Sequence, residues 1–496
     1  MNRIPRYLRF AAITRFAAFP IVLLPVLVSA QDDPGVAVDD APPNIIVVYI
    51  DDLGWADLPA YGNRFHETPA IDALASEGML FSAAYASAPV CSPSRAAMQT
   101  GQYPARLGLT NFIPGHLRPW EILVEPSNTP MHLPGQLVTV AESLRDAGYR
   151  TGYFGKWHLS FRDREQMPDR HGYDDVVVSR HGGHFIQPDT FTVGNPDSEE
   201  GDYLADVLTN ESIRFIRENK ARPFFLFLSH YAVHIPLHAD EELIGKYERK
   251  PLPDAEGIYN PRYAAMIEHV DDSLRRILDL IDELELTDST MIVFTSDNGG
   301  LSERFDKADG VVVTTNAPLR NEKGSLYEGG IRVPMIVRWP GAVPPNSRSA
   351  VPVSTVDFYP TFLGMAEASL PDQPLDGIDL RPVLSGEESS LDRSLFFHYP
   401  HYHHSRPAGA IVQGTSKLIE FYDSGEIELY DLSNDIAESR NLAVERPAEA
   451  STLADALRVW RDDVGAEMPT PNPEFDADHR LEWGLHPLLR PLRTDR

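Results

Sequence analysis

The stretch NIIVVYIDD, from Asn44 to Asp52, decides how the rest of the chain is interpreted. Asn44–Ile50 is an uncharged run rich in β-branched residues, which predicts a β-strand, and two carboxylates follow it directly. Three further apolar runs of similar length, separated by helical patterns, occur at Tyr149–Phe154, Pro223–Ser229 and Met291–Thr295. Strands that alternate with helices are typical of an α/β domain with a largely parallel sheet.

The periodicity changes along the chain and suggests two folded parts. Tyr259–Leu284 has apolar residues at helical spacing, within a large α/β domain that we place at residues 44–385. Beyond it, shorter alternating segments such as Gly409–Phe421 and Ile427–Leu432 predict a smaller α+β subdomain at residues 386–496. We therefore expect a mixed, mostly parallel central sheet flanked by helices, and a separate antiparallel sheet near the C-terminus.

The N-terminus has the pattern of a secretory signal peptide. Arginines precede an apolar run at 17–28, and small residues follow it up to Ala30. The run is shorter than the ~20 residues that a membrane span needs, which disfavours the alternative of a membrane anchor. We predict a signal peptide at residues 1–30, a linker at 31–43, a periplasmic or secreted mature chain, and no stable membrane insertion.

Composition limits the possible partners. The chain has 496 residues, 42% hydrophobic and 24% charged, and a formal net charge of −29. Proteins that bind nucleic acids are normally basic along one face, so no nucleic-acid partner is expected. The same charge cannot attract an anionic substrate, and any anion site must be built from local cations. The single cysteine, Cys91, excludes an internal disulfide.

Polar residues follow each predicted strand. Asp51 and Asp52 follow the first, Lys156 and His158 the second, His230 and His234 the third, and Asp297 and Asn298 the fourth. In an open α/β sheet, ligands bind beyond the carboxyl ends of the strands, so these groups are expected to share one site. The acidic and amide side chains are hard oxygen donors that suit Ca²⁺ or Mg²⁺ better than Zn²⁺. The alternative interpretation is that these residues only form turns.

Cys91-Ser92-Pro93-Ser94-Arg95 is the second informative motif. Pro93 fits the first position of a helix, Ser92 its cap and Gly101 its end, so Cys91 is predicted just outside a helix N-terminus. Helix N-termini bind anions, and the helix dipole disfavours a cation there. Arg95 in the first turn therefore indicates that a negative group lies nearby, unless it is an ordinary surface arginine.

These motifs resemble those of the type I sulfatases, which belong to the alkaline phosphatase superfamily. Cys91–Arg95 matches the family's C-x-P-x-R signature. Further blocks resemble the family in the same order along the chain: Asn44–Asp57, Cys91–Gly101, Gly155–Leu159, Ser296–Gly300 and Lys323–Pro334. The resemblance implies an alkaline-phosphatase-like fold for the large domain.

The resemblance also implies a cofactor and a set of site residues. In this family the signature cysteine is oxidised to formylglycine (3-oxoalanine) by a dedicated maturation enzyme, and its hydrate attacks the sulfur atom. Cys91 occupies that position. The family's single Ca²⁺ ion would be held by Asp51, Asp52, Asp297, Asn298 and the modified residue 91. The remaining active-site groups would be Arg95, Lys156, His158, His234 and Lys323, although His230 or His238 could be confused with His234.

The function that the resemblance implies is hydrolysis of sulfate esters, with release of inorganic sulfate from a sulfated saccharide. Two alternatives are a phosphate or phosphonate ester hydrolase of the same superfamily and a non-catalytic, calcium-bound carbohydrate-binding protein. The histidine-rich stretch His398–Arg406 is interpreted as a substrate-lining loop, a solvated loop or a metal site. Loop residues that could complete a sugar pocket are His116, Trp120, Arg180, His181 and His184.

Overall fold

The computed structural model describes residues 42–127, 131–161, 163–180, 183–254, 257–302 and 312–485. The chain from Pro42 onward belongs to one compact unit. The predicted signal peptide at 1–30, residues 31–41 of the predicted linker, and His181 lie outside the described residues.

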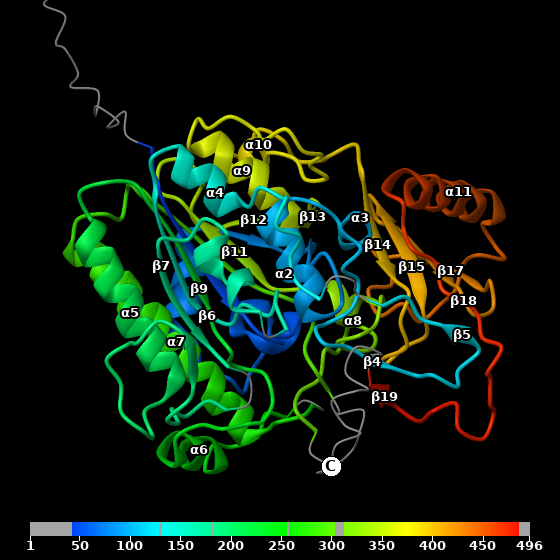
Figure 1. The fold of residues 1–496 in the computed structure, drawn as a ribbon, viewed down its shortest axis with the longest axis horizontal. Coiled ribbons are helices and arrows are strands. Elements are labelled where there is room, and N and C mark those ends of the chain that lie inside the picture. Colours follow the sequence, from blue (N-terminus) through cyan, green and yellow to red (C-terminus); the bar gives the residue numbers. More distant parts are fainter. Residues whose placement is uncertain are drawn as a thin grey trace, which may run out of the picture. The chain divides into compact units, whose positions relative to one another are not determined.

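A nine-stranded sheet forms the centre of the unit (Figure 1). Its strands, in spatial order, are β12 (Ser347–Ser349), β2 (Met79–Phe81), β11 (Met335–Arg338), β10 (Thr290–Ser296), β1 (Asn44–Ile50), β9 (Phe224–Ser229), β6 (Arg150–Gly155), β7 (Asp175–Ser179) and β8 (Phe191–Val193). The run from β10 to β7 is parallel, whereas β11 and β8 pair antiparallel with their neighbours. The prediction of a mixed, mostly parallel sheet is confirmed.

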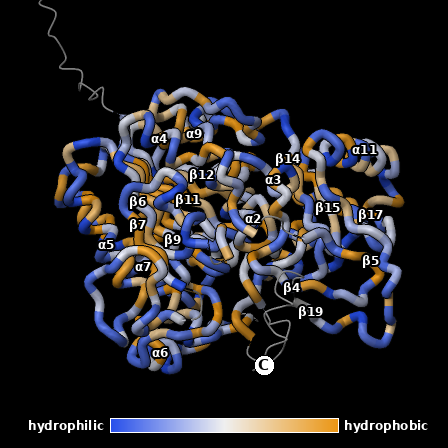
Figure 2. The backbone as a smooth tube through the Cα atoms, viewed as in Figure 1, coloured by the Kyte–Doolittle hydropathy of each residue, from blue (hydrophilic) through white to orange (hydrophobic). Residues whose placement is uncertain are grey.

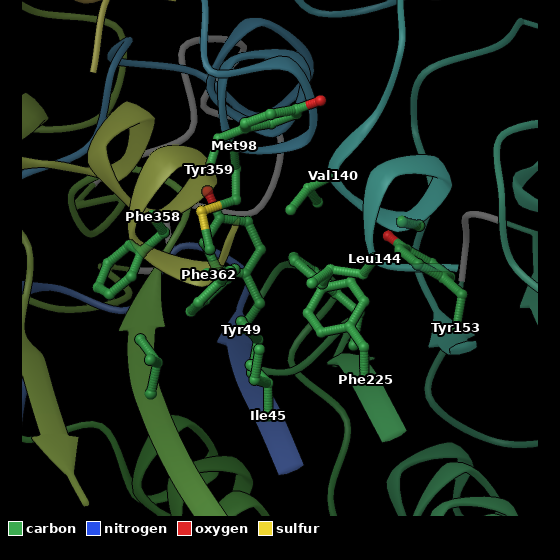
Figure 3. Packing of buried hydrophobic residues seen from close by; sticks show 14 of the residues in the cluster. Ile45, Tyr49, Met98, Val140, Leu144, Tyr153, Phe225, Phe358, Tyr359 and Phe362 are labelled. Carbon is green, nitrogen blue, oxygen red and sulfur yellow. The ribbon is translucent and has the colours of Figure 1, made fainter. Parts of the chain in front are cut away.

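Strand β1 shows why this sheet lies at the centre. Every residue of β1 is buried, because helices cover both faces of the sheet. Ile45 and Tyr49 point to one face, where they pack with Phe362 and other residues in the cluster drawn in Figure 3. Ile46 and Val48 belong to the cluster on the opposite face. Each fully buried side chain of this size contributes roughly 1.5–3 kcal/mol, which explains the absence of charge in this stretch.

Two groups of helices cover the sheet. The cluster that contains Ile46 draws residues from α1 (Pro69–Glu77), α5 (Leu204–Asn219), α6 (Glu241–Glu248) and α7 (Pro261–Glu283). The cluster that contains Ile45 draws residues from α2 (Cys91–Thr100), α4 (Val140–Asp146), α9 (Phe358–Met365) and α10 (Arg381–Leu384). The apolar residues of α7 and the central strands appear in orange in Figure 2.

The bounds of α7 follow from its local sequence. The Asn260 side chain accepts hydrogen bonds from the backbone N–H groups of Arg262 and Tyr263, at 3.1 and 3.3 Å, and Pro261 occupies the first helical position. The helix therefore begins at Pro261, two residues after the predicted start, and ends at Glu283.

A second, four-stranded antiparallel sheet lies toward the C-terminus, as predicted. Its strands are β14 (Ser394–Tyr399), β15 (Ala408–Gln413), β16 (Ser416–Phe421) and β17 (Ile427–Asp431), in that order. Helix α11 (Pro447–Val464) packs against β15 and β16 through Leu453 and Leu457. The boundary at residue 385 stays a prediction.

Short elements connect these layers. Paired two-residue strands are β3 (Ala84–Tyr85) with β13 (Val353–Ser354), β4 (His116–Leu117) with β19 (Gly484–Leu485), and β5 (Leu123–Val124) with β18 (Thr470–Pro471). The short helices are α3 (Pro104–Leu107) and α8 (Glu328–Ile331), and the 3₁₀ turns are Trp55–Asp57, Pro59–Tyr61, Arg164–Gln166, Pro168–Arg170 and Thr355–Asp357. In the described part of the chain, no helix combines the length and apolarity needed to cross a membrane.

Candidate active site at the carboxyl edge of the central sheet

Four neighbouring parallel strands end at one edge of the central sheet. Ile50 of β1 lies beside Ser296 of β10, and Tyr49 of β1 lies beside Ser229 of β9, which in turn lies beside Gly155 of β6. The residues that follow these ends are therefore brought together, as predicted from the positions of the strands.

Three buried carboxylates at this edge each contact a basic side chain. Asp51 is hydrogen-bonded to Lys156 Nζ. Asp52 Oδ1 and Oδ2 lie 2.7 and 2.8 Å from Lys323 Nζ. Asp297 Oδ2 accepts hydrogen bonds from Arg95. All of these side chains are at most 8% exposed, so the charges interact with little screening by solvent.

The backbone at Asp52 is fixed by several contacts. Asp52 has a φ of 63°, which is uncommon for a residue with a Cβ and costs about 1–3 kcal/mol. Its N–H donates to Asp297 Oδ1 at 3.1 Å, and its carbonyl accepts from Tyr263 Oη at 3.3 Å. Tyr263 also donates to Asp57 Oδ2 at 2.7 Å, and Thr314 donates to Asp57 Oδ1 at 2.6 Å. These contacts orient the Asp52 carboxylate toward the site.

Helix α2 places Cys91 at the site, but it begins earlier than predicted. Cys91 is the first helical residue and Val90 is the N-cap, so Cys91 is not outside the helix and Pro93 is the third helical residue. The Ser92 hydroxyl does not cap the helix; it accepts a hydrogen bond from Ile113 N–H at 2.9 Å. Proline is tolerated in the first turn because its position needs no intrahelical N–H donor. Gly101 ends the helix with a φ of 68°, as predicted.

Arg95 is a buried structural and electrostatic link rather than a surface arginine. Its Nε and Nη2 donate to Asp297 Oδ2 at 3.0 and 2.6 Å. Its Nη1 donates to Ser229 Oγ at 2.7 Å and to the Lys156 carbonyl at 3.1 Å. The negative group predicted beside Arg95 is therefore, at least in part, Asp297.

Burial and charge shift the pKa values of the acidic groups in opposite directions. Burial alone would raise the pKa of Asp51, but Lys156, His234, Arg95 and Lys323 hold it well below its usual value. Lys323 likewise outweighs burial and lowers the pKa of Asp52. For Asp297, burial outweighs Arg95 and raises the pKa to about 7.

The thiol behaves differently. Burial raises the pKa of Cys91 to about 12, although Lys156 and Lys323 oppose the shift. Cys91 is 2% exposed. An unmodified Cys91 is thus a protonated thiol near neutral pH, which is a poor nucleophile.

The side chains at this edge include a set that fits a metal ion. Asp51, Asp52, Cys91 and His234 each offer a ligand atom, and these atoms lie within 4.8 Å of one another. Among the described residues, Asp51 Oδ1 and Asn298 Oδ1 are buried oxygens that take part in no hydrogen bond. Buried polar atoms normally have partners, so the chemistry of these two oxygens fits the ligand atoms of a metal site. His234 was not predicted as a member of this set.

Hydrogen bonds to backbone carbonyls orient the histidines. Because a carbonyl can only accept, the contact of 2.6 Å between His158 Nε2 and the Ile113 carbonyl puts a proton on Nε2. His234 Nδ1 lies 2.6 Å from the Ile235 carbonyl, which leaves its Nε2 facing Asp52 Oδ2 at 3.5 Å. His230 instead contacts Ser273 Oγ at 3.0 Å and is fully buried, so it does not compete with His234 for this position.

The other described loop residues named from the sequence make contacts of different kinds. His184 Nε2 donates to the His234 carbonyl at 2.8 Å, and His116 lies within ring contact of Phe112. Arg180 instead forms an exposed ion pair with Asp189. Trp120 lies within ring contact of His479.

The histidine-rich stretch is mostly buried, which contradicts a solvated loop. His398 lies in β14 rather than in a loop, because it pairs with Gly409 of β15, and its Nδ1 lies 2.7 Å from Tyr422 Oη. His401 Nε2 lies 2.9 Å from Thr110 Oγ1, and His404 Nδ1 lies 2.8 Å from the Lys323 carbonyl. Within the described ranges these histidines join no candidate metal group.

Several residues at the site carried no recognisable signal in the sequence. Ser229 and Tyr263 contact Arg95 and Asp52 only because β9 and α7 pack beside β1. Asp57 lies inside the stretch that resembles the family, but nothing in the pattern distinguished its role. The ring centroids of Trp483 and His116, 367 positions apart in the sequence, lie 6.2 Å from each other, a contact that only the fold creates.

Comparisons with known proteins find that this chain is similar to sulfatases. The Sulfatase family profile matches residues 43–368, and that of the C-terminal region of N-sulphoglucosamine sulphohydrolase matches residues 321–459. A sulfatase from Formosa agariphila is 31% identical, with 90% of this chain and 93% of that protein covered. The N-acetylgalactosamine-6-sulfatase of Canis lupus familiaris is 34% identical, with 73% of this chain and 70% of that protein covered.

Solved structures share the fold. The crystal structure of Ps i-CgsB in complex with k-i-k-neocarrahexaose is 29% identical, with a TM-score of 0.71, and covers 88% of this chain and 94% of that one. The family profile covers most of the large domain, and the relatives match along most of the chain. The chain therefore belongs to the sulfatase family, and it is a sulfuric ester hydrolase.

Proposed function

We propose that this chain is a Ca²⁺-dependent carbohydrate sulfatase whose nucleophile is formylglycine produced from Cys91. One observation carries the proposal: Cys91 lies among three buried carboxylates and three cations, beside two buried oxygens that take part in no hydrogen bond in the described structure. The residue types and their arrangement suit a hard cation together with an anionic ester.

The residues proposed to hold Ca²⁺ are Asp51, Asp52, Asp297 and Asn298, with the modified residue 91. Carboxylate and amide oxygens are the ligands that Ca²⁺ prefers. The described residues contain one candidate group of metal-binding side chains, which supports a single ion rather than the paired ions of many phosphate ester hydrolases. His234 contacts the same group, and we assign it to the substrate side because its Nε2 faces Asp52 beside Lys323.

Each proposed cofactor supplies one part of the chemistry. Ca²⁺, when bound, withdraws charge from sulfate oxygens and lowers the pKa of a neighbouring hydroxyl group. Formylglycine, when hydrated, supplies the hydroxyl that attacks sulfur, which a protonated thiol cannot do. Three carboxylates and three cations balance in charge, so a divalent ion makes the site cationic and attractive to a sulfate ester despite the chain's net charge of −29.

The basic side chains neutralise the transferring group. Sulfate oxygens repel an incoming nucleophile, and prearranged cations lower that repulsion in the transition state. Lys156 contacts Asp51 and Lys323 contacts Asp52, and both positive charges oppose the rise that burial causes in the pKa of Cys91. Arg95 holds Asp297 in place, where that carboxylate can accept a proton from the nucleophilic hydroxyl.

The two histidines act as proton carriers. With its proton on Nε2, neutral His158 has Nδ1 as its acceptor atom, which suits a base that removes the proton of the second hydroxyl at residue 91. In neutral His234 the proton is on Nδ1, which donates to the Ile235 carbonyl, so Nε2 can donate to the oxygen of the departing alcohol only after His234 takes up a proton. The ammonium group of Lys323 stabilises that oxygen directly. An ordinary cysteine has no second hydroxyl, so this division of work depends on the modification.

The proposed substrate is a sulfated saccharide. Support comes from relatives named N-acetylgalactosamine-6-sulfatase, and from the neighbour solved in complex with k-i-k-neocarrahexaose. The predicted signal peptide places the enzyme in the periplasm or outside the cell. Because Cys91 is buried in the first turn of α2, a maturation enzyme must reach residue 91 before the fold closes around it.

Two measurements test the proposal. Mass spectrometry of the peptide containing residue 91 from active protein should show a mass lower than that of the cysteine form. Release of inorganic sulfate from sulfated saccharides should exceed release of phosphate from matched phosphate esters. An intact thiol in fully active protein, or full turnover by Cys91→Ala, would refute the nucleophile, and preferred phosphate release would refute the reaction.

A further inference from the structure

A pair of histidines lies directly on the backbone that carries Lys323. His404 Nδ1 lies 2.8 Å from the Lys323 carbonyl. The His403 ring fills the space beside Gly324, where a Cβ would come within 2.0 Å of His403 Nδ1. Gly324 also has a φ of 81°, so both its conformation and its neighbour require glycine. The histidine loop is therefore fixed against the proposed active site.

Aromatic rings extend this contact away from Lys323. The Phe112 ring centroid lies 6.0 Å from that of His403 and 5.5 Å from that of His116. The Trp483 ring lies 6.4 Å from His403 and 6.2 Å from His116. Together these side chains form a continuous wall, which we call the Trp483 wall.

The same wall is connected to the nucleophile side of the site. Ile113, next to Phe112, donates its N–H to Ser92 Oγ at 2.9 Å, and its carbonyl lies 2.6 Å from His158 Nε2. Ser92 directly follows Cys91. The wall is thus connected through Phe112 and Ile113 to His158 and Ser92, and through His403 to the backbone beside Lys323.

The wall is partly exposed, and so is the neighbouring Arg118. His403 is 7% exposed, whereas His116, Arg118 and Trp483 are intermediate in exposure. The Arg118 guanidinium lies 4.4 Å from the Trp483 ring centroid. Strand pairing of β19 with β4 holds Trp483 beside the 116–118 segment, and Figure 1 shows the labels of these two strands next to each other.

Buried carboxylates hold the loops that carry these side chains. Glu125 accepts from Arg118 N–H at 2.7 Å and from Tyr402 N–H at 2.9 Å, so it joins the two loops. Arg480 Nε lies 3.1 Å from Glu121 Oε1, which ties the C-terminal segment to the same loop. A wall built in this way is ordered before a ligand arrives, which lowers the entropy cost of binding.

We propose that His116, Arg118 and Trp483 form a subsite for the sugar unit next to the sulfated unit of an anionic oligosaccharide. An indole ring suits the C–H face of a sugar, and imidazole and guanidinium groups donate hydrogen bonds to hydroxyl, carboxylate or sulfate oxygens. The inference rests on the proposed carbohydrate sulfatase function, because it identifies where the rest of that substrate lies.

The test compares a long and a short substrate. The kcat/KM of Trp483→Ala and Arg118→Gln is measured with chondroitin 6-sulfate and carrageenan oligosaccharides, and with 4-nitrophenyl sulfate, which is too small to fill the subsite. We expect the loss on the oligosaccharide to exceed the loss on 4-nitrophenyl sulfate by about tenfold, mainly through KM. Titration calorimetry with Cys91→Ala, with and without Trp483→Ala, reports the same difference as binding.

Phe475→Ala serves as the matched control, because Phe475 belongs to the same C-terminal segment, is 46% exposed and lies outside the wall. Trp483→Phe, which keeps an aromatic ring, should recover part of the loss. Equal losses on both substrates, or none, would overturn the subsite alone. If the wild-type enzyme acts on 4-nitrophenyl sulfate but on no saccharide, the carbohydrate assignment fails and the subsite fails with it.

Discussion

Replacing Lys417 with methionine should destabilise the protein by about 3 kcal/mol. Lys417 lies in β16 with no exposed surface, and its Nζ lies 2.8 Å from both Glu328 Oε1 and Glu438 Oε1. Removing one partner of a buried ion pair costs roughly 3–5 kcal/mol. We expect the lower value, because Glu328 keeps Arg332 at 2.5 Å. In addition, burial raises the pKa of Glu438 to about 7, so Glu438 can take up a proton.

Urea unfolding at pH 7, followed by far-ultraviolet circular dichroism, measures this free energy. The double variant Lys417→Met/Glu438→Gln should recover part of the loss, since the second carboxylate is then neutral. Arg440→Met is the matched control: its ion pair with Glu445 is also 2.8 Å long but is 70% and 54% exposed, so about 1 kcal/mol or less is expected. A loss below about 1 kcal/mol for Lys417→Met, or no recovery in the double variant, would refute the reasoning.

The remaining predictions concern the site and its surroundings. Arg95→Ala should lower sulfate release by about 10²–10³-fold, because it removes a prearranged cation. Arg95→Lys should not restore the activity, since lysine cannot donate to Asp297 and Ser229 at the same time in this geometry. Substantial activity in either variant would contradict this role. Chelation with EGTA should lower both activity and melting temperature, and added Ca²⁺ should restore both; an unchanged melting temperature argues against a bound ion. His184→Leu should lower kcat by about tenfold with little change in KM, because the His234 carbonyl loses its donor, and His184→Gln should recover most of it; equal kcat for the two variants removes this explanation. Burial raises the pKa of Asp271 to about 6, so folding takes up a proton between about pH 4 and 6, and Asp271 contributes less stability as the pH rises through that window. Urea unfolding of the wild type and of Asp271→Asn at pH 4.5 and 7 should show that the asparagine variant gains stability relative to the wild type at the higher pH. A relative loss of stability at the higher pH would contradict this prediction.

Elements whose structure depends mainly on adjacent residues in the sequence were predicted well. Strand β1 matches its predicted bounds, and β6, β9 and β10 lie within one residue of theirs. These runs are apolar throughout because helices cover both faces of the sheet, and that pattern is visible in the sequence. The start of α2 was placed too late, because Ser92 and Pro93 resemble a cap and a first helical residue when tertiary contacts are ignored.

The order of the strands was not available from the sequence. The residues Asp51, Asp52, Asp297 and Asn298 were grouped correctly because parallel strands expose their carboxyl ends at one edge, a rule that needs no coordinates. Pairing within the group did require the fold. Asp52 contacts Lys323 and Asp297 contacts Arg95 only in the folded chain, where β10 pairs with β1 and the segments that carry Lys323 and Arg95 reach the ends of these strands.

By itself, the sequence determined the strand-and-helix pattern and the single cysteine, since these depend on residues within a few positions of one another. It also grouped the residues that follow the strand ends, because parallel strands end at one edge of a sheet. Tertiary structure alone decided that His234 rather than His230 contacts the carboxylates, that most of His398–His404 is buried, and that Trp483 lies beside His116. Such contacts join segments hundreds of residues apart, and they form only when the summed burial of the core fixes the register of every strand.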